Sequence, residues 1–297
     1  MKTITSELIQ KFRIYLINEE KAKATIEKYI HDVTVFMAWL GGQCVEKTLV
    51  IEYKNEIKEA FKPTSVNAII SSLNSFFNYN EWYECRVKAL KIQKKTYADK
   101  TKELTKQEYE KLVAAAEQKG NRKLSLLIQT ICSTGIRVSE LQYITVEAVK
   151  TKEALIKCKG KVRPIMLTKD LCKLLKEYIK DENIKSGSIF VTKSGKPLDR
   201  SHIWKLMKAL CESAGVPKEK VFPHNLRHLF ARRFYSIHKD VIRLADILGH
   251  SSVNTTRIYT MESGEMHRMQ IQKLGLLLTK KVNPHNSYYV DKNTANI

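Results

Sequence analysis

Apolar residues recur every three or four positions through the first part of the chain, which is the spacing of one face of an α-helix. This pattern predicts four helices: one after Thr5, one from Thr25, one around Ile51 and one from Thr64. Gly41 follows the second run, where a glycine commonly ends a helix. The pattern therefore predicts an all-helical domain in this region.

A second set of helical runs begins after Leu104. Thr105 and Glu108 have the spacing of a capping box, in which each side chain bonds the backbone N–H of the other residue. Helices are again the main element predicted. The helical runs cover about residues 105–117, 122–133, 137–144, 169–179, 199–213, 224–237, 240–248 and 263–278.

Three short runs rich in β-branched residues predict strands in this second region. Residues 154–158 and 162–167 flank the turn 159–161, and residues 188–192 form the third run. Pro164 inside the second run indicates an edge strand or a bulge. The predicted fold class is mainly α with a small antiparallel sheet, in two domains.

The segment between the two regions has no apolar periodicity. It carries Lys94, Lys95, Lys100 and Lys102, which favours an extended basic linker. We therefore predict four parts along the chain. They are a helical domain over residues 1–94, a linker over 95–104, a second domain over 105–279 and a polar tail over 280–297.

Composition narrows the class of partner. The chain has 297 residues, enough for roughly two domains, and its 52 Lys and Arg against 31 Asp and Glu give a net charge of +21. Such a charge attracts a polyanion, and nucleic acid is the favoured one because each phosphate contact releases a counterion. The alternative, a basic protein whose lysines are merely solvated, is not excluded by charge alone.

Other sequence features favour a cytoplasmic protein with no membrane partner. No stretch of about 18 apolar residues exists, so no membrane-spanning helix is expected. Lys2 is not followed by an apolar block, so we expect no signal peptide. The six cysteines form no C-x-x-C pair, which favours free thiols in a reducing compartment and argues against a metal site.

Four short segments carry the residue types that chemistry on an anion needs. In the first, Gly135 is expected to end one helix and Arg137 to open the next, beside backbone N–H groups that favour an anion. Glu140 lies three residues on and can hold this guanidinium. An ordinary surface pair of Arg137 and Glu140 would have the same spacing.

The other three segments are each weak alone. His224 and Arg227 are three apart and share a helical face. His250 follows a glycine turn, and Tyr259 comes nine residues later, where a half-buried core residue is the common alternative to a nucleophile. Lys159 lies in the predicted hairpin turn, where most lysines are simply solvated.

Taken together and in this order, these residues resemble the active site of the tyrosine recombinase (phage-type integrase) family. The segment 134–141 is similar to its T-G-x-R-x-x-E-L box, 224–228 to its H-x-L-R-H box and 248–259 to its L-G-H-S…T-x-x-Y box. The resemblance covers about residues 103–278. The helical N-terminal region resembles the family's core-binding domain. The residues of this chain that carry this likeness are Thr25, Tyr29, Asp32 and Phe36. The short N-terminal part resembles the two-domain Xer-type members.

The resemblance implies an enzyme that cuts and rejoins DNA through a covalent 3′-phosphotyrosyl intermediate. Tyr259 would be the nucleophile, and Arg137 and Arg227 would clamp the phosphate oxygens. His250 would donate a further hydrogen bond to the phosphate, and His224 would accept or relay a proton. No metal and no cofactor are implied.

The 5′-oxygen that leaves also needs a proton donor. Lys159 is the candidate, and Lys161 is its close rival because both flank Gly160. Glu140 would support Arg137.

The implied partners are duplex DNA and further recombinase subunits, as a homo-tetramer on DNA or with a related recombinase. The linker lysines 94, 95, 100 and 102 would contact the DNA backbone. The helices expected at 65–79 and 199–213 are candidates for the major groove. The segment 263–278 either packs into a neighbouring subunit, as in the family, or folds onto its own domain.

Two other functions remain open. A type IB topoisomerase has the same chemistry but relaxes supercoils, and a relative that binds DNA without cutting it would keep only the fold. Within recombinases, the sequence leaves open Xer-type resolution and mobile-element integration.

Overall fold

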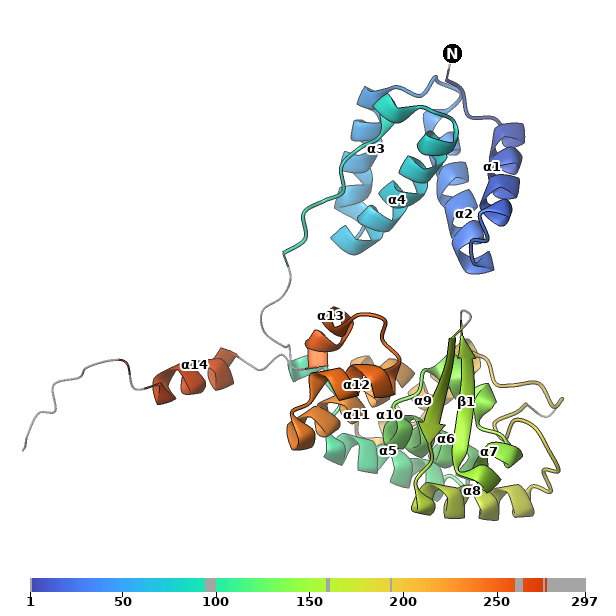
Figure 1. Ribbon diagram of the computed structural model, residues 1–297, viewed down its shortest axis with the longest axis vertical. Coiled ribbons are helices and arrows are strands. Elements are labelled where there is room, and N and C mark those ends of the chain that lie inside the picture. The colour runs from blue at the N-terminus through green and yellow to red at the C-terminus, as the bar shows by residue number, and fades with distance from the viewer. Residues whose placement is uncertain are drawn as a thin grey trace, which may run out of the picture. The chain divides into compact units, whose positions relative to one another are not determined.

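The computed structural model describes residues 2–93, 100–158, 161–192, 194–259, 264–274 and 276 (Figure 1). At residues 100, 158, 161, 264–267 and 270 it describes the backbone only. The chain divides into two compact units, Met1–Lys95 and Thr96–Ile297.

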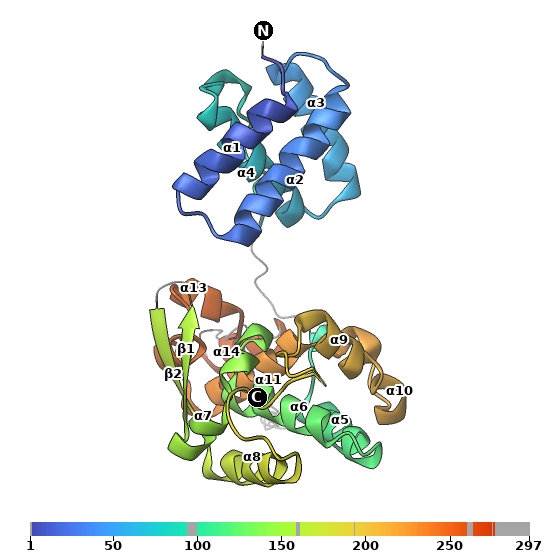
Figure 2. The ribbon, with the colours of Figure 1, turned by 90° about the vertical axis from the view of Figure 1, so that its right-hand side faces the viewer.

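The first unit is helical. Thr5 caps the first helix by accepting a hydrogen bond from Leu8 N, and Gly41 ends the second in the left-handed conformation. Helix α2 packs against α1, α3 and α4 (Figure 2). The bounds are α1 (Ser6–Asn18), α2 (Lys23–Leu40), α3 (Lys47–Ala60), α4 (Pro63–Tyr79) and η1 (Tyr83–Cys85), the last a 3₁₀ turn.

Aromatic side chains fill the core of this unit. Phe12, Phe36, Phe76 and Phe77 have no exposed surface, and the rings of Phe12 and Phe76 meet edge to face. These residues lie on the faces that the sequence periodicity predicted to be apolar.

The second unit is larger and also mainly helical. Helix α6 lies at its centre, in contact with α5, α8 and α11. Figure 2 shows the β-hairpin and α9 on opposite sides of this unit, with α11 between them. The bounds are η2 (Lys100–Lys102), α5 (Lys106–Gln118), α6 (Arg122–Thr134), η3 (Val138–Tyr143), α7 (Val146–Thr151), β1 (Glu153–Cys158), β2 (Lys161–Met166), α8 (Lys169–Asp181), α9 (Arg200–Lys208), α10 (Cys211–Ala214), η4 (Lys218–Lys220), α11 (Pro223–His238), α12 (Val241–Leu248), α13 (Val253–Thr256), η5 (Arg257–Tyr259) and α14 (Gly264–Lys273).

The two strands form an antiparallel ribbon in which Ile156 pairs with Arg163 and Leu155 with Pro164. Both strands are edges, so Pro164 costs the ladder little. The capping box of Thr105 and Glu108 is present with both of its bonds. Among the described residues this ribbon is the only sheet, and the predicted fold class is confirmed.

The third strand, predicted over 188–192, is wrong. Ile189 and Phe190 are buried by packing against the helices, and the backbone of this run forms only single bridges, Thr145 with Ser188 and Val191 with Pro197. Its apolar side chains serve the core of the unit rather than a sheet.

Three predicted helices differ in detail. The helix expected over 199–213 is two helices, because Leu210 N bonds Met207 O in a tighter turn between α9 and α10. The run over 137–144 is the 3₁₀ segment η3. The last helix is described over Gly264–Lys273, and residues 263, 275, 277 and 278 of its predicted range lie outside the described residues.

The start of the second unit is attached to helix α11. Asn225 is buried, and its amide donates to the carbonyls of Lys102 and Lys220 at 2.9 and 2.7 Å. Arg232 donates to Leu104 O at 2.7 Å and pairs with Glu103. The last three residues of the expected linker are thereby fixed to the helix that carries His224 and Arg227.

Candidate active site

Gly135 brings two parts of the site together. It ends α6 with a φ of +66°, and a Cβ at this position would collide with the ring of Phe230 on α11. The glycine therefore allows α6 and α11 to approach closely. Its carbonyl accepts a hydrogen bond from Arg227 Nη1 at 2.6 Å.

Arg227 is the most deeply buried charge of the site, with 1% of its surface exposed. Its Nη2 donates to Leu248 O at 2.7 Å and lies 2.9 Å from His250 Nε2. Within the described part of the chain no carboxylate pairs with it. Burial, with a contribution from Arg137, lowers the pKa of Arg227 to about 10, so the guanidinium is charged at neutral pH without a partner anion.

The tautomer of His250 follows from its two neighbours. A guanidinium has only donors, so His250 Nε2 must accept from Arg227. The proton then lies on Nδ1, which is 2.8 Å from Thr256 Oγ1 and donates to it. Burial and the nearby arginines lower the pKa of His250 to about 4, so the ring is neutral at pH 7.

Tyr259 completes this group within the same chain. Only 5% of its surface is exposed, and its ring lies 6.1 Å from that of His250 and edge-on to His228 at 4.9 Å. Its side chain interacts directly with the Arg227 guanidinium. We call Arg227, His250 and Tyr259 the buried cluster.

A second group lies at the more open side of the site. Glu140 Oε1 accepts from Arg137 Nη1 at 2.9 Å, and Glu140 Oε2 accepts from Arg163 Nη2 at 2.8 Å and from the backbone N–H of Arg137 at 2.8 Å. The Glu140 side chain is 5% exposed, whereas that of Arg137 is 40% exposed. We call Arg137, Glu140 and Arg163 the rim cluster.

His224 stands at the start of α11, one helical turn before Arg227. Its ring meets that of His228 at 4.4 Å between centroids. Desolvation, together with Arg227 and Arg137, lowers the pKa of His224. A neutral imidazole at pH 7 can accept a proton.

Two cavities meet at Arg137. One, of about 370 Å³, is lined by Arg137, His224 and Arg227 and extends to Trp204. The other, of about 700 Å³, is lined by the three residues of the rim cluster and by His250. The arginines therefore border enough space for an extended anionic ligand.

The structure brings together six of the residues singled out from the sequence, namely Arg137, Glu140, His224, Arg227, His250 and Tyr259. Lys159 lies outside the described residues. Lys161 begins β2, where its backbone pairs with Cys158.

The linker lysines are described only in part. Lys94 and Lys95 lie outside the described residues, and Lys100 begins the short turn η2. Lys102 is exposed and its carbonyl is bound by Asn225. Their contacts with DNA stay a prediction.

Sequence reasoning missed Arg163 and Thr256. Arg163 alternates with Val162 and Pro164 and so shares the face of Ile165, which is 3% exposed. A charge on the buried face of a strand was a usable signal. Thr256 has no exposed surface and lies in the T-x-x-Y box, but only the fold shows that it contacts His250.

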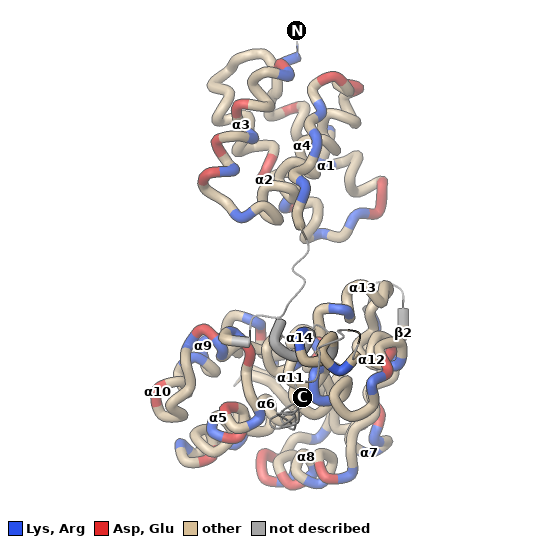
Figure 3. The backbone as a smooth tube through the Cα atoms, turned by 90° about the vertical axis from the view of Figure 1, so that its left-hand side faces the viewer, with Lys and Arg blue, Asp and Glu red and all other residues tan. Residues whose placement is uncertain are grey.

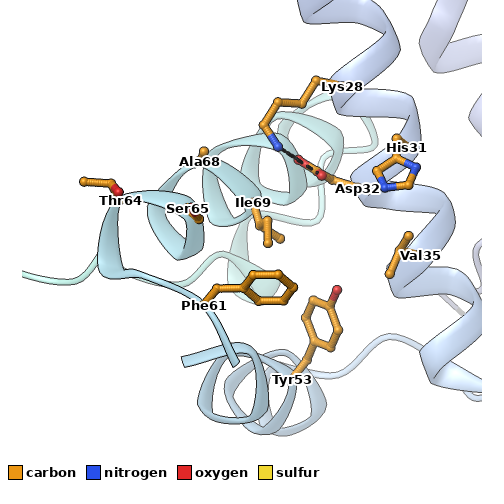
Figure 4. Close-up of a pocket in the computed structure, with 10 residues that line it drawn as sticks. All are labelled: Lys28, His31, Asp32, Val35, Tyr53, Phe61, Thr64, Ser65, Ala68 and Ile69. Carbon is orange, nitrogen blue, oxygen red and sulfur yellow. Dashed lines mark hydrogen bonds and ion pairs between the residues drawn. The ribbon is translucent and has the colours of Figure 1, made fainter. Parts of the chain in front are cut away.

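A further cavity, of about 470 Å³, lies in the first unit (Figure 4). Helices α2 and α4 form its walls, and Tyr53 of α3 and Phe61 close one side. Asp32 is 5% exposed in this cavity's wall and binds Lys28 at 2.8 Å and Ser72 Oγ at 2.6 Å. Its carboxylate is satisfied within the unit.

Charge, metals and membranes add three observations. Lysines and arginines occur on helices of both units, interspersed with acidic residues (Figure 3). A search of the described residues finds no group of three or more His, Cys, Asp or Glu side chains that could hold a metal ion. None of the helices in the described ranges has the length and apolarity to cross a bilayer.

Comparison with known proteins identifies the class. The model of the phage integrase family matches residues 102–266, and that of the phage integrase N-terminal SAM-like domain matches residues 9–84. The chain belongs to the phage integrase family, and the resemblance predicted from its motifs is confirmed.

Particular relatives agree with this assignment. The chain is 28% identical to tyrosine recombinase XerA of Pyrococcus furiosus, over 93% of this chain and 96% of that protein. Its fold is similar to that of the XerH site-specific recombinase bound to difH substrate, with a TM-score of 0.68, 22% identity and coverage of 91% and 85% of the two chains. A lambda integrase tetramer bound to a Holliday junction has a TM-score of 0.68 at 18% identity, over 85% and 76% of the two chains.

Proposed function

We propose that this protein is a site-specific DNA recombinase that cuts and rejoins DNA through a covalent 3′-phosphotyrosyl bond at Tyr259. The observation that carries the proposal is the buried cluster. Its phenol lies against the Arg227 guanidinium of the same chain, and that guanidinium has no carboxylate partner among the described residues. A phosphodiester supplies the missing anion next to the nucleophile.

The chemistry follows from these positions. The Tyr259 oxygen attacks phosphorus, the P–O bond to the 5′-oxygen breaks, and the tyrosine–phosphate bond keeps the energy needed for rejoining. Arg227 and Arg137 bind the non-bridging oxygens, where charge develops in the transition state. Tyr259 must leave its buried position to make room for the phosphate, because Arg227 is 1% exposed.

A neutral His224 fits the role of proton acceptor. His224 accepts the phenol proton, directly or by relay. His250 acts through Arg227, because its Nε2 accepts from that guanidinium at 2.9 Å and its Nδ1 donates to Thr256; a hydrogen bond from His250 to the phosphate would need the ring to change partners. Lys159, with Lys161 as its rival, protonates the 5′-oxygen that leaves. Protein cations neutralise the phosphate in this scheme, so it assigns no step to a metal ion or cofactor.

The substrate and assembly are proposed from the relatives. We propose duplex DNA as substrate and a tetramer as the active form, because structural neighbours are recombinases on DNA and one is a tetramer. The linker lysines contact the DNA backbone, and α4 and α9 enter its grooves. We place the protein in the cytoplasm, where it resolves replicons or integrates a mobile element.

The end of the chain favours exchange between subunits over the topoisomerase alternative. Met269 and Ile271 of α14, and Leu274 and Leu276 after it, are 45–83% exposed in the isolated chain. An apolar surface of this kind suits burial in a neighbouring subunit. A topoisomerase that works as a monomer has no use for it.

Trapping the covalent intermediate tests the proposal. The full chain first selects sequences from a pool of random duplexes, and a nicked suicide duplex is built on the selected sequence. We expect a denaturation-resistant adduct with the native protein and none with Tyr259→Phe. Tyr235→Phe, a change of the α11 tyrosine next to Lys239, is the matched control and keeps the adduct.

Two outcomes would contradict the proposal. An adduct that persists in Tyr259→Phe assigns the nucleophile elsewhere. An adduct that leads to relaxation of a supercoiled circle, without exchange between two selected sites, assigns a topoisomerase.

A further inference from the structure

Arg163 is a largely buried cation for which the reaction above has no use. It lies on β2, and 15% of its side chain is exposed. Its Nη2 donates to Glu140 Oε2 at 2.8 Å, and its Nη1 donates to the carbonyl of Ile247 at the end of α12. One guanidinium therefore connects the hairpin to two other segments of the site.

The first connection sets the charge that Arg137 presents. Glu140 is nearly buried, so its negative charge is weakly screened by water. With Arg137 as its sole cation, it would form a neutral pair, and the phosphate would meet little net charge. Arg163 supplies a second positive charge to the same carboxylate, which leaves the rim cluster with one net positive charge.

The same connection fixes the direction of Arg137. Glu140 uses Oε1 for the guanidinium of Arg137 and Oε2 for Arg163 and the backbone N–H of Arg137. Without Arg163 the carboxylate can rotate, and the guanidinium it holds rotates with it. Arg137 itself is 40% exposed and has donors left for a ligand.

The second connection holds the turn that carries His250. A Cβ at Gly249 would lie 2.6 Å from Arg163 Nε and 2.7 Å from Arg163 Cδ, so the arginine stem lies directly on the glycine. Gly249 has a φ of +63° and is followed at once by His250. Arg163 thus fixes the turn both by packing and by its bond to Ile247 O.

We propose that Arg163 is a positioning residue that balances the charge of Glu140, orients Arg137 toward the scissile phosphate and fixes the turn before His250. The inference rests on the proposed function of Arg137 and His250. Arg163 acts through these residues and does not touch the phosphate, in keeping with its low exposure.

Variants that remove one or both charges test the inference. The native chain, Arg163→Gln, Glu140→Gln and the double variant are compared for single-turnover cleavage of the selected suicide duplex at saturating protein, and separately for its affinity. We expect Arg163→Gln to slow cleavage about 100-fold, the order that a misplacement of about 1 Å can cost. The double variant restores one net charge on Arg137, and we expect it to cleave about 10-fold faster than Arg163→Gln.

A merely structural role predicts the opposite pattern. Loss of two packing residues would multiply, so a double variant as slow as Arg163→Gln, or slower, overturns the inference. Cleavage by Arg163→Gln within about threefold of the native rate also overturns it. Arg122→Gln is the matched control, because it removes an arginine that bonds Glu177 and Asp181 away from the site, and it keeps the native rate.

A conservative variant covers the case in which Arg163→Gln does not fold. Arg163→Lys keeps the charge but cannot reach both Glu140 and Ile247 O. We expect cleavage about 10-fold slower with unchanged affinity for the duplex, and native cleavage would overturn the inference. The proposed function fails separately, because that failure appears as an adduct in Tyr259→Phe whatever Arg163 does.

Discussion

The two clusters of the site treat their arginines differently. Arg227 is 1% exposed, bonds two carbonyls and a neutral imidazole, and lacks a carboxylate partner among the described residues. Arg137 is 40% exposed on its side chain and is held by Glu140, which Arg163 balances. The buried cluster holds a charge with no carboxylate beside it, whereas the rim cluster keeps one net positive charge on an arginine that a carboxylate orients.

This difference teaches how the site can be selective for a phosphate. Burial disfavours the charged form of Arg227, as its lowered pKa shows. Under the proposed function, an incoming phosphate would offset that penalty by supplying the anion that Arg227 lacks. At Arg137 a phosphate would gain mainly a well-aligned donor. We therefore expect the buried cluster to supply more of the electrostatic stabilisation and the rim cluster more of the orientation.

The sharpest test of this comparison removes each guanidinium in turn. We expect Arg227→Met to slow single-turnover cleavage about 1,000-fold and Arg137→Met about 100-fold, the two ends of the range for loss of a transition-state donor. The adduct yield from the suicide duplex over time measures both rates. A larger loss for Arg137→Met would reverse the comparison.

The tautomer of His250 gives a smaller effect. Thr256→Val keeps the shape of the side chain but leaves the Nδ1 proton of His250 without an acceptor. We expect cleavage to fall about 10-fold, in line with the cost of an unsatisfied buried donor. Thr255→Val, at the exposed neighbouring position, is the control. Equal rates for the two variants would show that Thr256 does not hold the ring.

We expect acid to destabilise the fold through two buried histidines, His228 and His250. The pKa of His228 is lowered to about 3 and that of His250 to about 4, chiefly by burial. Below about pH 6.5 the unfolded chain takes up protons that the folded chain refuses, so the free energy of unfolding falls as the pH drops toward 4.

Urea unfolding between pH 8 and pH 4 measures this dependence. His228→Asn removes one such group and should flatten the curve below pH 6.5. A curve parallel to that of the native chain would place the acid sensitivity outside this histidine.

The smallest expected effect is a change of the melting temperature when an anion binds. Sulfate can occupy the place of the phosphate and neutralise Arg227, so it should raise the melting temperature by about 2–4 °C over chloride at equal ionic strength. We expect the increase to persist in Arg137→Met and to vanish in Arg227→Met. An increase lost in both variants alike would erase the distinction between the clusters.

Local rules predicted the elements that depend on neighbours in sequence. The capping box at Thr105 and the helix end at Gly135 were predicted correctly because their physics is contained within a few residues. The strand over 188–192 was wrong because apolar runs in strands and in buried loops have the same composition, and packing decides between them.

The site was predictable in its members but not in its connections. The motifs named Arg137, Arg227 and Tyr259, yet their contacts join segments about 100 positions apart, such as Arg227 with Gly135 O. Periodicity carries no signal for such contacts. Strand alternation places Arg163 on the buried face of β2, but its partners on η3 and α12 are seen only in the fold.

The attachment of Asn225 to Lys102 has a consequence for communication along the chain. Asn225 stands between His224 and Arg227 in sequence, and it is bonded to the backbone where the polypeptide arrives from the N-terminal unit. Under the proposed function, a pull on that incoming segment would reach the helix of His224 and Arg227 directly through this bond.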